Sequence, residues 1–200
     1  MSTRRSRRRR SLAATLLVSA ILTAGCSSAA VTPAPAVQAM GVAAGRGDAD
    51  VRFSQEMITH HRLTIRLAAL VEGRTGNPYV RDLAAALTRD ERADIELMSG
   101  WLRSWGAEVP QDAGYAAHAS HSAHDMPGMP SAAQISSLER RSGAAFDRLW
   151  LTVLGRHLGG GVQMSQVVIA LGTHRPTARL ADRLVTEQRA RIAEITEKLA

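Results

Sequence analysis

Hydrophobic residues recur with the 3.6-residue period of an amphipathic helix in four separate segments of the chain. The first and third segments cover about 48–72 and 145–171, and the second and fourth cover about 78–105 and 176–199. Glycine and proline interrupt the pattern between the paired segments, where they favour the end of one helix and the start of the next. The pattern therefore predicts two helical hairpins. Their apolar stripes include Phe53, Met57, Ile58, Ile65, Ala68, Leu83, Leu87, Ile95, Met98 and Leu102, and then Leu180, Leu184, Ile192, Ile195 and Leu199.

The two predicted hairpins repeat one another. A shift of 97 residues places 50–102 on 147–199 without a gap. The matched identities include Asp50/Asp147, His60/His157, Val71/Val168, Leu83/Leu180, Leu87/Leu184, Ile95/Ile192 and Leu102/Leu199. A duplication is the simplest explanation. Neither hairpin can bury its apolar stripe alone, so we expect an all-α fold in which the two pair as a four-helix bundle.

The first 25 residues have the features of a bacterial export signal. Six arginines precede a short uncharged run at 11–22, which is too short to span a bilayer comfortably. The run ends in Leu22-Thr23-Ala24-Gly25-Cys26, which is typical of a lipoprotein signal whose cysteine carries the lipid. We therefore predict a signal peptide over 1–25, lipidation of Cys26 and anchoring to the outer face of the cell membrane. The alternative is an ordinary signal peptide followed by an incidental cysteine.

Composition narrows the class of protein. The hydrophobic content of 45% excludes a wholly disordered chain, and an aromatic content of 4% favours helices over a β-sandwich. The formal charge of +7 falls to +1 without the six N-terminal arginines. We therefore expect no nucleic-acid binding by the mature protein. The small residues of 26–45 predict a flexible tether, followed by the first hairpin (46–105), a linker (106–134) and the second hairpin (135–200).

The linker concentrates side chains that bind metals. His118, His121 and His124 are spaced three residues apart, and Met126 and Met129 follow them. Imidazole suits Cu(II), whereas the softer thioether favours Cu(I) or Ag(I). Together they predict a copper site that needs no thiolate. The alternative is a polar loop that happens to contain histidine. A short helix over about 131–142 is expected before the second hairpin.

A second group of candidate ligands lies within the predicted bundle. Met57, His60 and His61 share adjoining faces of the first helix. The repeat places His157 opposite His60, with Met164 nearby, so these five side chains could hold a soft metal between the helices. The alternative is that the two matched histidines hydrogen-bond between helices and bind nothing.

Three motifs together resemble a known bacterial family, domain of unknown function 305. They are Met57-Ile58-Thr59-His60-His61, the linker segment His124-Asp125-Met126-Pro127-Gly128-Met129, and Ser142-Gly143-Ala144-Ala145-Phe146-Asp147-Arg148. The resemblance covers about 48–200 and implies a ferritin-like four-helix fold, export and, by likeness to some members, copper binding.

The chain departs from the family pattern at three places. Leu67 stands where the family usually has methionine, and Leu158 stands where it has a second histidine. Gly159-Gly160-Gly161 then follows inside a predicted helix, at a cost of roughly 1 kcal/mol per glycine relative to alanine. This glycine run predicts either a kink or a close backbone approach.

These observations predict a membrane-tethered extracytoplasmic metal-binding protein that sequesters or buffers copper. A metal-free helical interaction module of the cell envelope is the alternative. A di-iron oxidase is disfavoured because the chain contains no Glu-x-x-His motif, and we expect no enzymatic activity. The expected binding partners are the membrane, through the lipid anchor, and metal ions, and the sequence leaves open whether the protein forms a homodimer.

Overall fold

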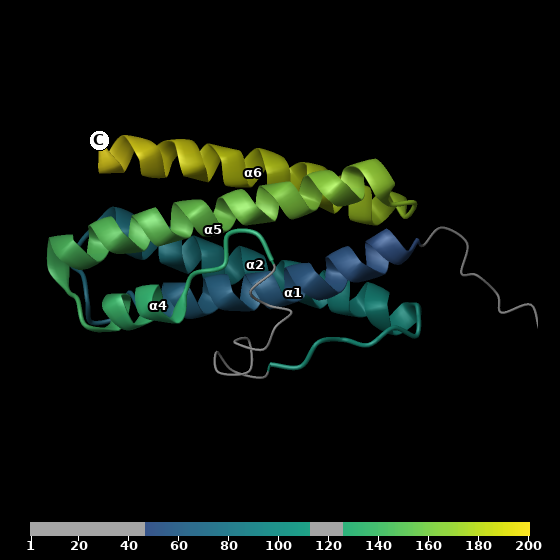
Figure 1. Cartoon of the computed structure of the whole chain (residues 1–200), viewed down its shortest axis with the longest axis horizontal. Coiled ribbons are helices and arrows are strands. Elements are labelled where there is room, and N and C mark those ends of the chain that lie inside the picture. Colours follow the sequence, from purple (N-terminus) through teal and green to yellow (C-terminus); the bar gives the residue numbers. More distant parts are fainter. Residues whose placement is uncertain (1–46, 113–125) are drawn as a thin grey trace, which may run out of the picture. The chain divides into compact units, whose positions relative to one another are not determined.

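The computed structural model describes residues 47–112 and 126–200, and this part of the chain is helical and contains no strand. Its elements are α1 (Asp48–Ala69), α2 (Pro78–Ser104), α4 (Ala132–Glu139), α5 (Gly143–Leu171) and α6 (Arg175–Leu199) (Figure 1). The all-α prediction is confirmed. The four long helices lie within a few residues of the predicted segments, and α4 is the short helix expected before the second hairpin.

Local sequence explains where the helices begin. The Asn77 side chain accepts the Tyr79 backbone N–H, and Pro78 opens α2, where the missing N–H costs nothing. The Ser131 side chain and Gln134 form a reciprocal capping box at the start of α4. His174 caps α6 by accepting the Thr177 N–H on Nδ1. The breaks at 73–78 and 172–176 thus act as the sequence predicts.

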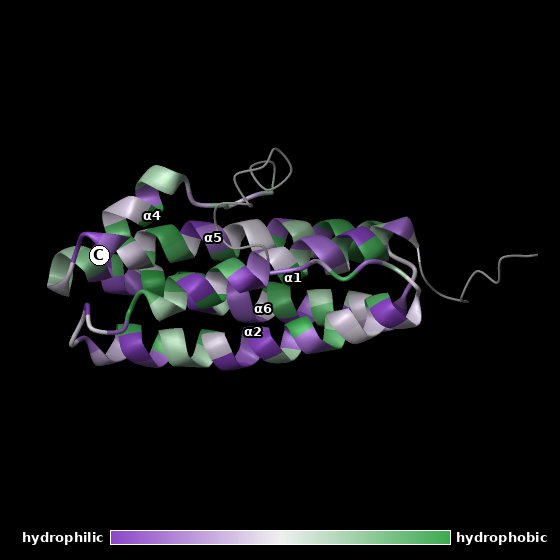
Figure 2. Cartoon of the chain, turned by 90° about the horizontal axis from the view of Figure 1, so that it is seen from below, coloured by the Kyte–Doolittle hydropathy of each residue, from purple (hydrophilic) through white to green (hydrophobic). Residues whose placement is uncertain are grey.

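The helices pack as two hairpins, α1 with α2 and α5 with α6, and the hairpins meet through α1 and α5. The pairing helices are the two that the repeat makes equivalent. Hydrophobic and hydrophilic residues alternate along the long helices (Figure 2), because each helix has one face in the core and one toward solvent. No helix in 47–112 or 126–200 has the length and hydropathy needed to cross a membrane.

The core consists of two apolar clusters. One surrounds Trp150, whose indole N–H donates to the Leu67 carbonyl at 2.8 Å. The other surrounds Met57 and Met164, near the start of α1. Along α1 the buried polar residues His60, His61 and Thr64 lie between the two clusters. The middle of the bundle is therefore polar.

The buried carboxylate of Asp50 joins the two hairpins at one end of the bundle. One of its oxygens accepts the backbone N–H groups of Gly47, Thr173 and His174 at 2.8, 2.9 and 3.0 Å. The first turn of α1 is thereby fixed to the turn between α5 and α6. Gly47, where the described chain begins, lies at this end.

Candidate metal site

His60 and His157 form the contact between α1 and α5. Their rings stack with centroids 3.7 Å apart and planes inclined by 8°. Nε2 of His60 donates to the His157 carbonyl at 3.1 Å. The prediction that the repeat brings these two histidines face to face is confirmed.

His157 has polar partners around its whole ring. Nε2 lies 3.0 Å from the Thr64 hydroxyl and 3.2 Å from the His60 carbonyl, and Nδ1 lies 3.4 Å from the Gly128 carbonyl. Burial lowers the pKa of His157 to about 4, and burial together with the neighbouring histidines lowers that of His60 well below its ordinary value. Both rings are therefore neutral near pH 7, which permits them to stack.

His61 lies in the opposite electrostatic environment. It is fully buried and ion-paired to Glu91, and its Nε2 lies 3.7 Å from the Asp94 carboxylate. Burial alone would lower the pKa of His61, but the carboxylates of Glu91 and Asp94 outweigh burial and raise it to about 9. A protonated imidazole has no lone pair to offer a metal. In this arrangement His61 is a partner of carboxylates and not a free ligand.

The three histidines thus contact one another, Thr64, Glu91 and Asp94, and the metal site predicted inside the bundle remains a prediction. In 47–112 and 126–200 no group of three or more His, Cys, Asp or Glu side chains could hold a metal ion. Of the two predicted methionines, Met57 is fully buried in apolar surroundings, whereas Met164 reaches a pocket. The linker ligands His118, His121 and His124, like Cys26, lie outside the described residues.

The C-terminal end of the linker docks onto α5 beside His157. Gly128 has a φ of +77°, a conformation that favours glycine, and its carbonyl faces the His157 ring. A Cβ on Gly160 would lie 1.9 Å from the Pro127 carbonyl oxygen. The close backbone approach predicted from the glycine run is therefore confirmed, and α5 remains one continuous helix through it. Met126 and Met129, on either side of this contact, are half-buried.

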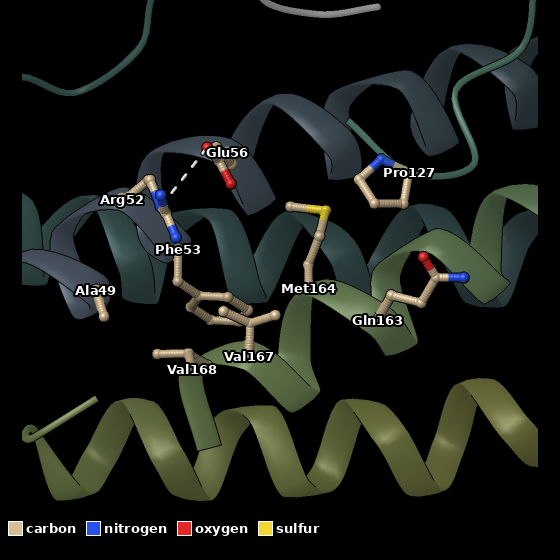
Figure 3. A pocket seen from close by; sticks show the side chains of 9 residues that line it. All are labelled: Ala49, Arg52, Phe53, Glu56, Pro127, Gln163, Met164, Val167 and Val168. Carbon is tan, nitrogen blue, oxygen red and sulfur yellow. Dashed lines mark ion pairs between the residues drawn. The ribbon is translucent and has the colours of Figure 1, made fainter. Parts of the chain in front are cut away.

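A small pocket opens next to this docked segment (Figure 3). It has a volume of about 140 Å³ and is lined by Ala49, Arg52, Phe53, Glu56, Pro127, Gln163, Met164, Val167 and Val168. The sulfur end of Met164 points into the space between Glu56 on α1 and Pro127. Met126, next to Pro127, packs against the apolar cluster that contains Met164. Partial burial raises the pKa of the Glu56 carboxyl, although Arg52 opposes this shift.

Sequence reasoning missed Glu91, Asp94 and Arg183, which complete the network around His61. Arg183 on α6 donates to the Asp94 carboxylate and pairs with Glu187 at 3.1 Å. The sequence does contain an indication of this network, because Glu91 lies in the apolar stripe of α2, four residues after Leu87. A charged residue at a buried helical position needs a partner of opposite charge.

A family model described as "Domain of unknown function (DUF305)" matches residues 50–199. The chain belongs to the DUF305 family. Two solved members of this family are each 26% identical to it with TM-scores of 0.66. One, from Streptomyces coelicolor and named a secreted protein, matches over 76% of this chain and 90% of its own; the other, from Deinococcus radiodurans, over 78% and 97%.

CopM, which has been solved in a Cu(II)-bound form, has a similar fold. Its Cu(II)-bound form is 22% identical over 75% of this chain and 95% of CopM, with a TM-score of 0.63. At that identity the likeness shows the fold alone. None of the curated proteins matches the chain.

The His61 network predicts alkaline destabilisation. The pKa of His61 is about 9 in the folded protein against 6.5 ordinarily, so its contribution to stability is complete below pH 6.5 and is lost as the pH rises through about 9. We expect the free energy of unfolding to fall by on the order of 3 kcal/mol across this window, measured by urea denaturation. Glu91→Gln should flatten this slope. An unchanged slope in that variant would contradict the assignment.

The contact at Gly160 predicts opposite effects at neighbouring glycines. Gly160→Ala should push Pro127 off α5 and lower the free energy of unfolding by roughly 1–3 kcal/mol, because the added methyl meets backbone atoms. Gly159→Ala is the matched control, since nothing lies within 4 Å of its added Cβ, and it should stabilise α5 by about 1 kcal/mol. Chemical denaturation measures both. Equal effects would show that the linker end is not held at Gly160.

Proposed function

We propose that this protein is exported, anchored by lipid at Cys26 to the outer face of the cell membrane, and binds copper there for sequestration or homeostasis. The observation that carries the metal-binding part is the position of the Met164 thioether. It lies in a pocket that is open to solvent, and Pro127, at the end of the His/Met-rich linker, forms one wall of this pocket.

The donor atoms around this pocket suit a soft cation. Met164 supplies a thioether at the pocket, and Met126 and Met129 carry two more on the adjoining linker segment. Thioethers favour Cu(I) and Ag(I) over Zn. The Glu56 carboxylate adds a negative charge at the rim. His118, His121 and His124 would supply the imidazoles that Cu(II) prefers.

The histidines inside the bundle serve this function less well. A metal on His157 would have to replace the contacts that hold α1, α5 and the linker together. A metal on His61 would first have to displace a proton held by two carboxylates. His60, His61, Met57 and His157 are therefore assigned to stability, and copper to the linker and Met164.

Two further observations support the proposal. CopM, which has the same fold, has been solved with Cu(II), Cu(I) and silver bound. The N-terminal segment has the order of features that directs a chain out of the cell, and the DUF305 relative from Streptomyces coelicolor is named a secreted protein. Because the chain contains no Glu-x-x-His motif, we propose that the protein binds its metal and does not use it in catalysis.

Substitution of the thioethers tests the metal site. Met126→Leu/Met164→Leu should weaken Cu(I) binding about tenfold or more, because leucine keeps the volume and removes the donor. Met98→Leu is the matched control, since Met98 is buried in the same apolar cluster and does not line the pocket. Competition with a chromophoric Cu(I) chelator measures the affinity.

Substitution of the linker histidines, measured in the same way, distinguishes the Cu(II) ligands from the Cu(I) ligands. His118→Ala/His121→Ala/His124→Ala should lose Cu(II) binding first and retain more of the Cu(I) binding. Weak binding of both ions by all these proteins, with no difference between variants, would favour the metal-free interaction module.

The anchor has its own test. Cys26→Ser removes the thiol that would carry the lipid, so this variant should leave the membrane fraction that retains the native protein. Sedimentation in high salt distinguishes a lipid anchor from surface adsorption. A variant that still sediments completely with membranes would contradict lipidation.

A further inference from the structure

The exposed large hydrophobic residues of the described chain gather at one end of the bundle. Val167, Ile169 and Leu171 occupy the last turns of α5 and are 45%, 39% and 62% exposed, and Leu97, near the end of α2, is 44% exposed. Val167 lines a pocket between α1 and α5, whereas Leu97 lines a groove between α2 and α6, so these residues share one end of the bundle. Isolated exposed apolar residues are ordinary, but several of them at one end of a bundle indicate an interaction surface there.

Two tryptophans lie at the same end of the bundle, beside Leu97. Trp101 and Trp105 are half-buried near the end of α2, and their rings meet His174 edge-on with centroids 5.3 and 4.9 Å away. Leu97 and Trp101 line an open groove of about 430 Å³ together with Pro176 and Arg179 of α6. Tryptophan is the residue enriched where one side of a ring is apolar and the other wet, as at the surface of a bilayer.

The position of Gly47 shows that the chain leading back to Cys26 joins the bundle at this end. Asp50 bonds both Gly47 and the turn 172–174, so the chain enters the bundle directly beside Leu171 and His174. Twenty residues separate Cys26 from Gly47. Even fully extended they span at most about 70 Å. A lipid on Cys26 therefore keeps this end of the bundle within that distance of the bilayer.

We propose that this end of the bundle, formed by Leu97, Trp101, Trp105, Val167, Ile169 and Leu171 and called the tether end, docks onto the lipid surface that holds Cys26. The proposal rests on the lipid anchor of the proposed function. The tryptophan rings and aliphatic side chains enter the headgroup layer, and the exposed Arg175 and Arg179 contact lipid phosphates. The anchor makes docking intramolecular, so weak contacts suffice.

Docking would also orient the metal pocket. Val167 belongs both to the tether end and to the pocket that contains Met164. With the tether end on the bilayer, the pocket lies beside the membrane surface and not at the far end of the bundle. Ions would then be bound and released next to the membrane.

Tryptophan fluorescence of the lipidated full-length protein tests this proposal. The protein is reconstituted in vesicles of phosphatidylcholine and phosphatidylglycerol, with and without bromine on the acyl chains of the phosphatidylcholine. Brominated lipid should quench the native protein and leave Trp101→Phe/Trp105→Phe unquenched, because the remaining Trp150 is fully buried.

Matched variants locate the contact. Ala170 and Ala145 are both exposed on α5, one near each end, so Ala170→Glu should reduce quenching and Ala145→Glu should leave it unchanged. Arg175→Gln and Arg179→Gln should each lower the ratio of docked to undocked protein about fivefold at low salt. Circular dichroism confirms that each variant keeps its helical content.

Flotation of the vesicles reports the anchor separately from docking. Protein that floats but is not quenched by brominated lipid would overturn docking and leave the anchor intact. Protein that does not float would overturn both. Unquenched protein that cross-links as a dimer through the tether end would overturn docking and assign the surface to a second copy of the chain.

Discussion

The contact between two neutral imidazole rings determines how the two halves of this protein fit together. His60 and His157 occupy equivalent positions in the repeat and stack where α1 crosses α5. Charged rings could not approach this closely in a buried site, because their repulsion would be barely screened. Burial, which keeps both rings uncharged, is thus a condition of the fold as well as its result. The linker depends on the same contact, since Gly128 docks against the outer edge of His157.

The two segments that match at a shift of 97 residues differ at the neighbouring buried position. The first repeat pairs His61 with Glu91, and the shift of 97 residues places Leu158 and Gln188 at the corresponding positions. Gln188 is as buried as Glu91, and its side chain packs against Gly161, which has no side chain of its own. The ion pair between α1 and α2 therefore corresponds to two uncharged buried residues in α5 and α6.

The sequence allows prediction of those features that depend on periodicity and on the repeat. The helix bounds follow from the spacing of apolar residues and from Gly and Pro, and the facing of His60 and His157 follows from the shift of 97 residues. The state of His61 does not follow, because it depends on carboxylates about thirty residues away along the chain, at Glu91 and Asp94. Likewise, the run of glycines at 159–161 indicates that another part of the backbone approaches the helix, but only the folded chain identifies this neighbour as Pro127.

The hydrogen bonds of Asp50 have a mechanical meaning for a protein held by one end. If the protein is anchored at Cys26 as proposed, the domain is pulled where the described chain begins, at Gly47. In an isolated helix such a pull would unravel the first turn, where the N–H groups have no partners within the helix. The Asp50 carboxylate instead links Gly47 to the backbone of Thr173 and His174. Force applied at Gly47 would therefore be shared between both hairpins, and α1 would not bear it alone.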